Sequence, residues 1–417
     1  MSFLQQYDAA PADQKAKLLF YWVQTNPQAL FAELRANRPI LVTPPPGPVL
    51  LTLFADVQEA LSRNAIFTVR PYAPKMDPAV GPYMLARDDT VYNQRDKSVM
   101  RALLRQDDMP AVAAMAARRA AEAVGEVAKS GRIEVVSQLS RRVPIEVVGE
   151  HFGFPGPDLA TMMRWSRATQ YDMFHNLTND PKVHQDSVQA GAEMRAYLGQ
   201  LIPARRQALA QVPADDTLSR MLLTHLPEVI GFDDERIVSN TMGLLVGAVE
   251  TTSAAVVQLL DQLLDRPDVL AKAVAAAKAN DDATVAAYCW EALRFNPINP
   301  FIVRLGVADY TVAAGTPRAT TIKAGTLVLA SNASAMMDAA QVPAPETFTP
   351  GRPDYHYMHF GYGAHTCLGD QVSLAQVPQM VKALLLKPGL KRAPGSDGRP
   401  DFQDGPFPER FVLQFDA

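Results

Sequence analysis

Hydrophobic residues recur at three- and four-residue spacing along most of the chain, which is the pattern of helices with one buried face. Segments with this pattern are residues 26–37, 56–63, 93–105, 110–129, 138–152, 159–211 and 288–295, the sixth divided by a turn near Asn179-Asp180-Pro181. The longest predicted helix begins after Asp233, a residue type that caps helices, and ends before Pro267. Short apolar or extended runs predict strands at residues 49–54, 298–303, 309–312 and 320–330. We therefore expect a mainly α-helical fold with small β-sheets.

Prolines and capping residue types mark the breaks between these segments. The cluster Pro44-Pro45-Pro46-Gly47-Pro48 ends the first helical region. Asp56 is predicted to be the N-cap of the next helix. Residues 68–90 contain four prolines and little periodicity, which predicts a long irregular loop. Long ordered loops are usually functional, so this loop is a candidate wall of a binding pocket.

Composition narrows the class of protein. A chain of 417 residues with 48% hydrophobic and 20% charged residues is typical of a globular protein with a large core. Its net charge of −4 gives no sign of a nucleic-acid partner. The only two cysteines, Cys289 and Cys367, exclude a disulfide framework and favour a reducing compartment. The longest early apolar run, residues 18–23, is shorter than the ~20 residues that span a bilayer, so we expect a soluble, cytoplasmic protein without a membrane anchor.

The stretch from Phe360 to Gly369 places one cysteine among three glycines ahead of an apolar, helix-like run. Glycines such as Gly361 allow the backbone to approach a flat ligand closely. A cysteine at the start of a helix feels the positive end of the helix dipole, which favours the thiolate, the form that binds a metal. Cys367 is therefore a candidate metal ligand, and His365 is placed to reach an anionic group at the edge of a ligand.

The middle of the long predicted helix combines small residues with an acid inside an apolar run. Gly247 and Ala248 leave space for a ligand to lie against the backbone, and an acid, Glu250, follows a run of seven apolar or small residues. Burial of a carboxylate is costly unless it is paired or neutral, which indicates a site. Thr251 comes four residues after Gly247, so its hydroxyl can compete for the Gly247 carbonyl and open the helix there.

These two stretches together resemble the cytochromes P450. Residues 360–369 meet the family's pattern Phe-x-x-Gly-x-His-x-Cys-x-Gly at every fixed position, and residues 247–251 are similar to its oxygen-activating groove, with the two small residues in the order Gly-Ala where Ala-Gly is usual. The resemblance implies that Cys367 is the axial ligand of the iron of haem b (iron protoporphyrin IX), and that Glu250 and Thr251 guide protons to oxygen. The residues that it implies to lie against the haem are Phe360, Gly361, His365, Gly247, Ala248, Lys97, Arg101 and Arg304, with Lys97 where the family usually has His.

A third motif, Glu291-Ala292-Leu293-Arg294, lies ahead of the cysteine in the order that the family shows. A Glu and an Arg three residues apart share a helix face, and alone they are typical of a surface ion pair. The resemblance implies instead a structural triad of Glu291, Arg294 and Arg352. The family's usual Asn-Arg-Asp is reduced here to Met336-Met337-Asp338, which keeps only the acid.

The resemblance implies a soluble, bacterial-type monooxygenase built as one domain over residues 1–417, without a fused reductase or ferredoxin, and monomeric. It would insert one oxygen atom of O2 into a hydrophobic small organic substrate. Two cysteines cannot hold an iron–sulfur cluster that needs four cysteine ligands, so electrons from NAD(P)H would arrive through a separate ferredoxin or flavodoxin with its reductase. The alternatives are a peroxide-dependent haem-thiolate enzyme and a haem-binding protein without turnover.

Apolar and aromatic side chains in the segments around the expected pocket are candidates for substrate contact. For several of them ordinary core packing, or the pinning of a loop, is an equally good interpretation. The candidates are Tyr72, Tyr83, Met84, Met173, Phe174, Leu244, Phe301 and Val303.

Overall fold

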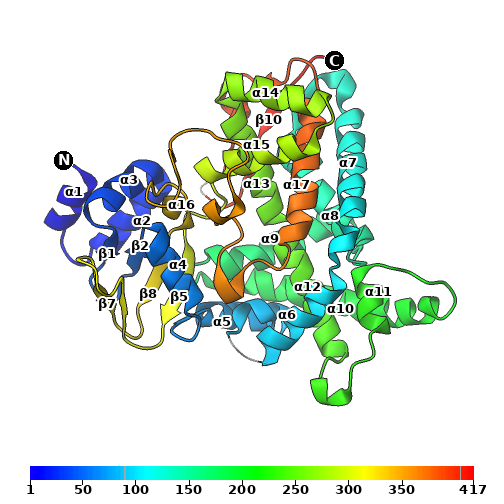
Figure 1. Ribbon diagram of the computed structural model, residues 1–417. Helices are drawn as coiled ribbons and strands as arrows, with labels where there is room; N and C mark the ends of the chain where they lie inside the picture. The colour runs from blue at the N-terminus through cyan, green and yellow to red at the C-terminus, as the bar shows by residue number, and fades with distance from the viewer. Residues whose placement is uncertain (89–90, 404) are drawn as a thin grey trace. The chain divides into compact units, whose positions relative to one another are not determined.

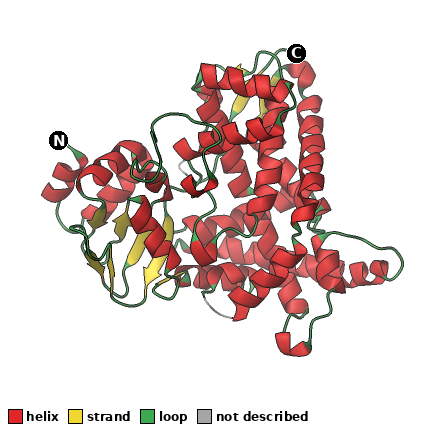
Figure 2. Cartoon of the chain, viewed as in Figure 1, coloured by secondary structure: helices red, strands yellow, loops and turns green. Residues whose placement is uncertain are grey.

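The computed structural model describes residues 1–88, 91–403 and 405–417 (Figure 1). Its contacts divide the chain into two compact units, the first formed by residues 1–71 and 294–367 and the second by residues 72–293 and 368–417. Helices predominate, and the strands are few and short (Figure 2). The expected mainly α-helical fold with small sheets is confirmed.

The first unit combines short helices with most of the strands. Its helices are α1 (Phe3–Ala9), α2 (Lys15–Thr25), α3 (Pro27–Asn37), α4 (Phe54–Ser62) and α16 (Asn332–Ala335). Its strands are β1 (Ile40–Val42), β2 (Val49–Leu51), β3 (Phe67–Thr68), β5 (Ile302–Gly306), β6 (Tyr310–Val312), β7 (Thr320–Ile322) and β8 (Leu327–Ala330).

The sheet of the first unit has the strand order β1-β2-β8-β5-β3. β2 and β8 are parallel, with Val49 opposite Val328, and β8 and β5 are antiparallel, with Leu329 opposite Val303. The predicted strand 320–330 is two strands, because the turn after β7 sends β8 into this sheet while β7 pairs with β6. The sheet fixes the place of Val303 and Arg304 on its inner strand β5.

The second unit is built from long helices. They are α5 (Ala73–Val80), α6 (Val91–Leu103), α7 (Met109–Glu126), α8 (Arg142–Glu150), α9 (Leu159–His175), α10 (Pro181–Leu209), α11 (Thr217–Leu223), α12 (Asp234–Ala248), α13 (Glu250–Leu264), α14 (Pro267–Lys278) and α17 (Asp370–Leu385), with α15 (Asp282–Phe295), whose end belongs to the first unit. A small sheet joins β4 (Arg132–Glu134), β10 (Val412–Gln414) and β9 (Lys391–Arg392).

Local signals placed several helix ends correctly. Asp233 caps α12 by accepting a hydrogen bond from the Arg236 amide at 3.1 Å, and Asp180 caps α10 through the Lys182 amide at 2.8 Å. The turn between α9 and α10 includes Asn179 with a positive φ of 56°. The predicted single long helix after Asp233 is wrong in one respect: it is interrupted at Val249, so that α12 and α13 have 15 residues each and α10, with 29, is longer.

Asp56 is not an N-cap. α4 begins at Phe54, so Asp56 lies in its first turn, where it is buried and accepts hydrogen bonds from Arg318 at 2.9–3.2 Å. The cap comes from elsewhere in the chain, because the Asp338 carboxylate accepts the Phe54 amide at 3.0 Å. Asp338, the one residue kept from the family's usual Asn-Arg-Asp, thus fixes the start of α4.

The predicted irregular loop at residues 68–90 is largely helical. It contains α5 and short 3-10 turns at Arg70–Tyr72 and Met84–Ala86, while residues 89–90 lie outside the described part of the chain. Pro74 is tolerated because it stands in the first turn of α5, where a backbone N–H has no partner within the helix. Packing of α5 against α10 supplies the stabilisation that the sequence pattern did not show.

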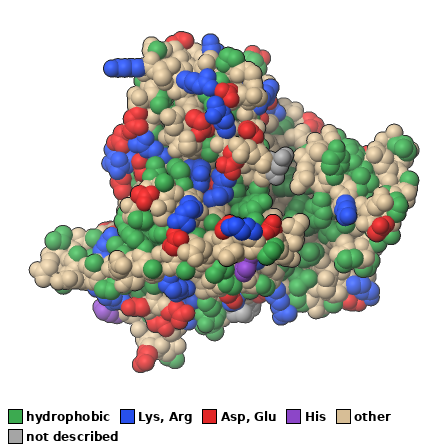
Figure 3. Space-filling view, turned by 180° about the vertical axis from the view of Figure 1, so that it is seen from behind, with side chains coloured by type: hydrophobic (Ala, Val, Ile, Leu, Met, Phe, Trp, Pro, Cys, Tyr) green, Lys and Arg blue, Asp and Glu red, His purple; other side chains and the backbone are tan. Residues whose placement is uncertain are grey.

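The described residues include one stretch, Asp234–Leu264, that by length and composition alone is apolar enough to cross a membrane. Its most apolar window is 83% buried inside the protein. This burial is that of a core helix. On the face shown in Figure 3, acidic and basic side chains are interspersed.

A brace of carbonyl contacts joins two arginines of the first unit. The fully buried Arg294 donates to the Met336 carbonyl at 3.0 Å and to the Thr347 carbonyl at 3.3 Å. Arg352 donates to the same Thr347 carbonyl at 3.0 Å and to those of Pro343 and Ala344 at 2.6 and 2.9 Å. The two guanidinium groups therefore hold one segment of irregular chain in place.

Replacement of Arg294 by Lys should weaken this brace. An ammonium group keeps the charge but lacks the planar fork, so at least one buried carbonyl loses its donor. Each such loss costs about 1–3 kcal/mol of unfolding free energy. Urea unfolding of Arg294→Lys is the measurement, with Arg38→Lys, a swap at an exposed ion pair to Asp8, as its control. Equal midpoints for the two variants would contradict the brace.

The contact between α5 and α10 depends on the absence of a side chain at Gly191. A Cβ atom there would lie 2.1 Å from the Ala79 carbonyl oxygen, whereas one at Gly199, eight positions along the same helix, would have nothing within 4 Å. Gly191→Ala should therefore force α5 away and destabilise the protein by about 1–3 kcal/mol.

Gly199→Ala is the matched control and should stabilise the protein by roughly 0.5–1 kcal/mol, because alanine favours the helix. Thermal unfolding of both variants tests the pair. Similar shifts of the same sign at the two positions would show that close approach of α5 is not what Gly191 provides.

Candidate functional site

The interruption at Val249 places two candidate residues at the edge of α13. Val249, with φ −96° and ψ −62°, stays in the right-handed helical region but belongs to neither α12 nor α13, and Glu250 begins α13. The Thr251 hydroxyl donates to the Gly247 carbonyl oxygen at 2.7 Å. This is the competition predicted from the four-residue spacing, and the prediction is confirmed.

The helix is open to one side at this point. Gly247 is exposed, although the six residues before it are buried, and a Cβ atom built on it would have nothing within 4 Å. Ala248 and Thr251 are half-buried. Small residues and a bonded hydroxyl therefore border open space along this face, as expected for a surface that lies against a flat ligand.

Glu250 is fully buried, and both of its carboxylate oxygens are occupied. Its Oε1 accepts from Arg141 at 2.7 and 3.0 Å, and its Oε2 accepts from Arg167 Nε at 2.9 Å. Two guanidinium groups offset the desolvation that an isolated buried carboxylate would suffer. The carboxylate is thus held in place by two elements, the segment between the π-turn Val136–Ser140 and α8, and helix α9.

Cys367 lies in a tight loop of the first unit. Its amide donates to the Phe360 carbonyl at 2.9 Å, and the Thr366 hydroxyl and amide both donate to the Gly363 carbonyl, at 2.8 and 3.1 Å. Gly361 and Gly363 have positive φ of 76° and 75°, which side chains rarely adopt. A Cβ atom at Gly363 would lie 2.6 Å from the Leu61 carbonyl, so this glycine is also required for close contact with α4.

Cys367 is not part of a disulfide and is exposed, and it stands three residues before the first residue of α17. The other cysteine, Cys289, is fully buried, and burial raises the pKa of its thiol. Only Cys367 therefore combines access with a loop that can present a thiolate. His365, half-buried, closes a short 3-10 turn in the same loop, and Phe360 is also half-buried.

The basic candidates differ in their surroundings. Arg101, in the last turn of α6, is exposed, and Lys97 is half-buried. Arg105, four residues after Arg101, lies beyond the end of α6 and is bound by Asp108 and Asp215, at 3.0 and 2.6 Å. Arg304 is buried on β5, with one nitrogen donating to the Val303 carbonyl at 2.9 Å.

The substrate candidates of the second unit gather in one apolar cluster. Tyr83, Met84, Met173 and Leu244 are buried in it. Tyr72 and Phe174 pack against it half-buried, with ring centroids 5.4 Å apart. In the first unit, Val303 is buried on β5, and Phe301 lies edge-on to Phe20 at 6.4 Å. Glu291, of the predicted triad, is fully buried on α15.

Sequence reasoning missed Arg141 and Arg167. They lie 109 and 83 positions from Glu250, and neither belongs to a motif. The only signal was the rule that a buried acid requires a cation, which does not say which cation.

The donors fit a haem held by one protein ligand. Among the described residues there is no group of three or more His, Cys, Asp or Glu that could hold a metal ion by itself. A single exposed thiol in a glycine-rich loop therefore suits a metal whose other ligands belong to a porphyrin. In the second unit, the open face beside Gly247 has room for a flat ring.

Comparison with known proteins agrees with these features. Residues 157–409, more than half of the chain, match the family model for cytochrome P450. The mycinamicin IV hydroxylase/epoxidase of Micromonospora griseorubida is 27% identical over 87% of this chain and 88% of its own. The vitamin D(3) 25-hydroxylase of Pseudonocardia autotrophica is 27% identical over 89% of each chain.

Solved structures share the fold. Cytochrome P450 CYP109Q5 from Chondromyces apiculatus has a TM-score of 0.78 at 22% identity, covering 94% of this chain and 96% of its own. Substrate-free CYP109E1 from Bacillus megaterium has the same TM-score and identity, covering 94% of this chain and 100% of its own. The family model, the cysteine loop and the interrupted helix agree, and the chain belongs to the cytochrome P450 family.

Proposed function

We propose that this cytochrome P450 is a monooxygenase that inserts one oxygen atom of O2 into a hydrophobic small organic molecule, and that Glu250 and Thr251 serve its proton supply. The observation that carries the assignment of the two residues is the interrupted helix, where the Thr251 hydroxyl is bonded to the Gly247 carbonyl beside open space. The printed names of the relatives, a hydroxylase/epoxidase and a 25-hydroxylase, support oxygen insertion.

Haem b supplies the oxygen-activating chemistry, with electrons that come from NAD(P)H through a separate ferredoxin or flavodoxin and its reductase. The Cys367 thiolate would hold the iron and donate electron density to it. Arg101, Lys97, Arg304 and His365 would bind the propionates, and Phe360 and Gly361 would lie against the ring. Gly247 and Ala248 would leave room for the ring on the side of α12.

Thr251 can hold a proton donor at a defined place. Its hydroxyl hydrogen is directed to the Gly247 carbonyl, so its oxygen lone pairs remain able to accept from a water molecule in the open space. Glu250, next in the chain, is a carboxylate whose two arginine partners must loosen before it can carry a proton. The two residues therefore have different roles: Thr251 orients the water molecule, and Glu250 exchanges the proton.

The substrate that we propose is hydrophobic. Tyr83, Met84, Met173 and Leu244 form an apolar cluster, and Tyr72 with Phe174 adds a half-buried aromatic pair to it. Phe301 and Val303 would contribute from the first unit. We further propose that residues 1–417 form a single cytochrome P450 domain, that the protein is a monomer, and that it works in the cytoplasm.

Replacement of Cys367 tests the haem ligand. Cys367→His should abolish the red-shifted absorbance band of the reduced carbon-monoxide complex, because imidazole lacks the electron donation of a thiolate. Cys289→Ala is the matched control and should keep the band, since Cys289 is a fully buried core residue. An unchanged band in Cys367→His would exclude Cys367 as the ligand.

Replacement of Thr251 tests the proton supply. Thr251→Ala should leave substrate binding and haem reduction intact, while product formed per cofactor oxidised falls by at least about twofold and peroxide release rises. The control is Thr252→Ala, which removes the same atoms from a buried threonine whose hydroxyl faces Gln376. If both variants keep wild-type coupling, the interrupted helix is only structural, and a peroxide-dependent enzyme becomes the better assignment.

A further inference from the structure

Arg167 is shared between two carboxylates. Its Nε donates to the buried Glu250 at 2.9 Å, and its Nη1 donates to Glu409, which belongs to the loop ahead of β10. Glu409 is 242 positions away from Arg167 in the sequence. The side chain of Glu409 is 35% exposed, whereas that of Glu250 is fully buried. One guanidinium thus joins a buried acid, Glu250, to a partly exposed acid, Glu409.

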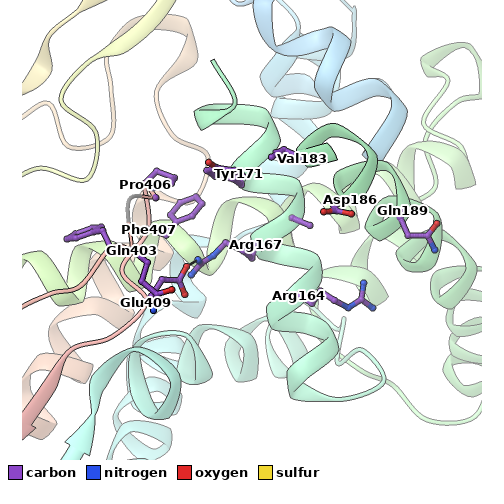
Figure 4. A pocket seen from close by; sticks show the side chains of 13 residues that line it. Arg164, Arg167, Tyr171, Val183, Asp186, Gln189, Gln403, Pro406, Phe407 and Glu409 are labelled. Atoms are coloured by element: carbon purple, nitrogen blue, oxygen red, sulfur yellow. Dashed lines mark hydrogen bonds and ion pairs between the residues drawn. The ribbon is translucent and has the colours of Figure 1, made fainter. Parts of the chain in front are cut away.

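Glu409 and Arg167 both line a cavity of about 610 Å³. Its walls are α9, the first turns of α10 and the loop that carries Phe407 and Glu409 (Figure 4). Figure 4 shows the Arg167 and Glu409 side chains directed toward each other across this wall. Arg167 therefore both binds Glu250 and borders the cavity.

The guanidinium also contacts an aromatic ring. Arg167 lies over Phe407 at 4.9 Å from the ring centroid, and His175 meets the same ring edge-on at 4.8 Å. Burial lowers the pKa of His175 to about 4, so this histidine is neutral near pH 7 and adds no charge. Of the other charged groups that line the cavity, Arg164 is paired with Glu193 and Asp186 with Lys182. Among the charged groups that line the cavity, Glu409 is thus the one that pairs with Arg167.

We propose that Glu409 is a positioning residue for Glu250. Because Glu409 also accepts a hydrogen bond from Arg167, the ion pair between Arg167 and Glu250 is weaker, and the Glu250 carboxylate can separate from Arg167 more easily. A guanidinium has five donors, and sharing them between two acids weakens its bond to each. Without Glu409, Arg167 would serve Glu250 alone, and the ion pair would tighten. This inference rests on the proposed role of Glu250 as a proton carrier.

The sharing is testable by unfolding of the haem-loaded protein, without turnover. Glu409→Gln and Glu250→Gln each leave Arg167 one carboxylate, but the double variant leaves it none. The fall in unfolding midpoint of the double variant should therefore exceed the sum of the two single falls. In an Arg167→Gln background this excess should vanish. Additive falls in the wild-type background would overturn the proposal.

The consequence for the reaction is tested by turnover in H2O and D2O. Glu409→Gln should slow oxygen-dependent turnover by at least about threefold and raise the solvent isotope effect, because the proton carrier is held more tightly. The substrate-induced change in haem absorbance should stay at wild-type size. Glu409→Asp, which keeps the charge, should restore most of the rate.

Glu193→Gln is the matched control, since it removes an acid that binds α9 through Arg164 without touching Arg167. It should keep the wild-type rate and isotope effect. An equal slowing in Glu193→Gln and Glu409→Gln would overturn the proposal, because loss of any acid bound to α9 would then suffice.

Glu250→Gln separates this inference from the proposed function. If Glu250→Gln is slow while Glu409→Gln turns over at the wild-type rate with the wild-type isotope effect, only the positioning role fails. If Glu250→Gln itself keeps the wild-type rate, both the proton-carrying role of Glu250 and the inference that depends on it are overturned.

Discussion

The burial of the Glu250 carboxylate is the constraint on which the centre of the second unit depends. A carboxylate in an apolar interior requires opposite charge and hydrogen bonds to both oxygens, or it would take up a proton. Arg141 and Arg167 supply these, and each comes from a different element. One buried carboxylate therefore ties α9 and the segment before α8 to α13. Removal of either arginine would leave this buried carboxylate with a single guanidinium, and breaking a buried ion pair in this way destabilises a protein.

The helix is irregular directly before Glu250. The helix is interrupted at Val249, and the Gly247 carbonyl accepts the Thr251 hydroxyl. Hydroxyl bonding of this kind bends helices and slightly destabilises them. The loss is confined to one turn between two 15-residue helices whose other side chains are largely buried. Extensive packing on both sides thus holds a local defect that an isolated helix would relax, and the defect is where the proposed chemistry lies.

Local signals in the sequence were sufficient for much of the fold and for the residues of the two motifs. Asp233 caps the helix that it was expected to cap, the turn at Asn179-Asp180-Pro181 lies where it was predicted, and the spacing of Gly247 and Thr251 predicted their hydrogen bond. Contacts between distant positions could not be predicted in this way. Asp338 caps α4 from 284 positions away, which displaced Asp56 from that role.

Helix α5 and the partners of Glu250 escaped prediction for the same reason. The stretch that contains α5 was predicted to be irregular because it is rich in prolines, which disfavour helices. The helix forms there because it packs against α10. Arg141, Arg167 and Glu409 have no shared pattern, since their common feature is a meeting in space. Motifs encode which residues react, whereas the charges that tune them are recorded only in the fold.

Two small residues one turn apart on α12 show where packing stops and the open face begins. A Cβ atom at Gly243 would lie 2.3 Å from the Tyr83 ring, so this ring fills the space that the missing side chain leaves. Gly247 comes four residues later on the same helix face, and a Cβ atom there would meet nothing within 4 Å. The chain thus covers one glycine with its own aromatic side chain and leaves the next uncovered. Because Tyr83 lies at this boundary, a smaller residue there would extend the open face toward Gly243, which makes the Tyr83 ring a physical limit on what can lie along the helix.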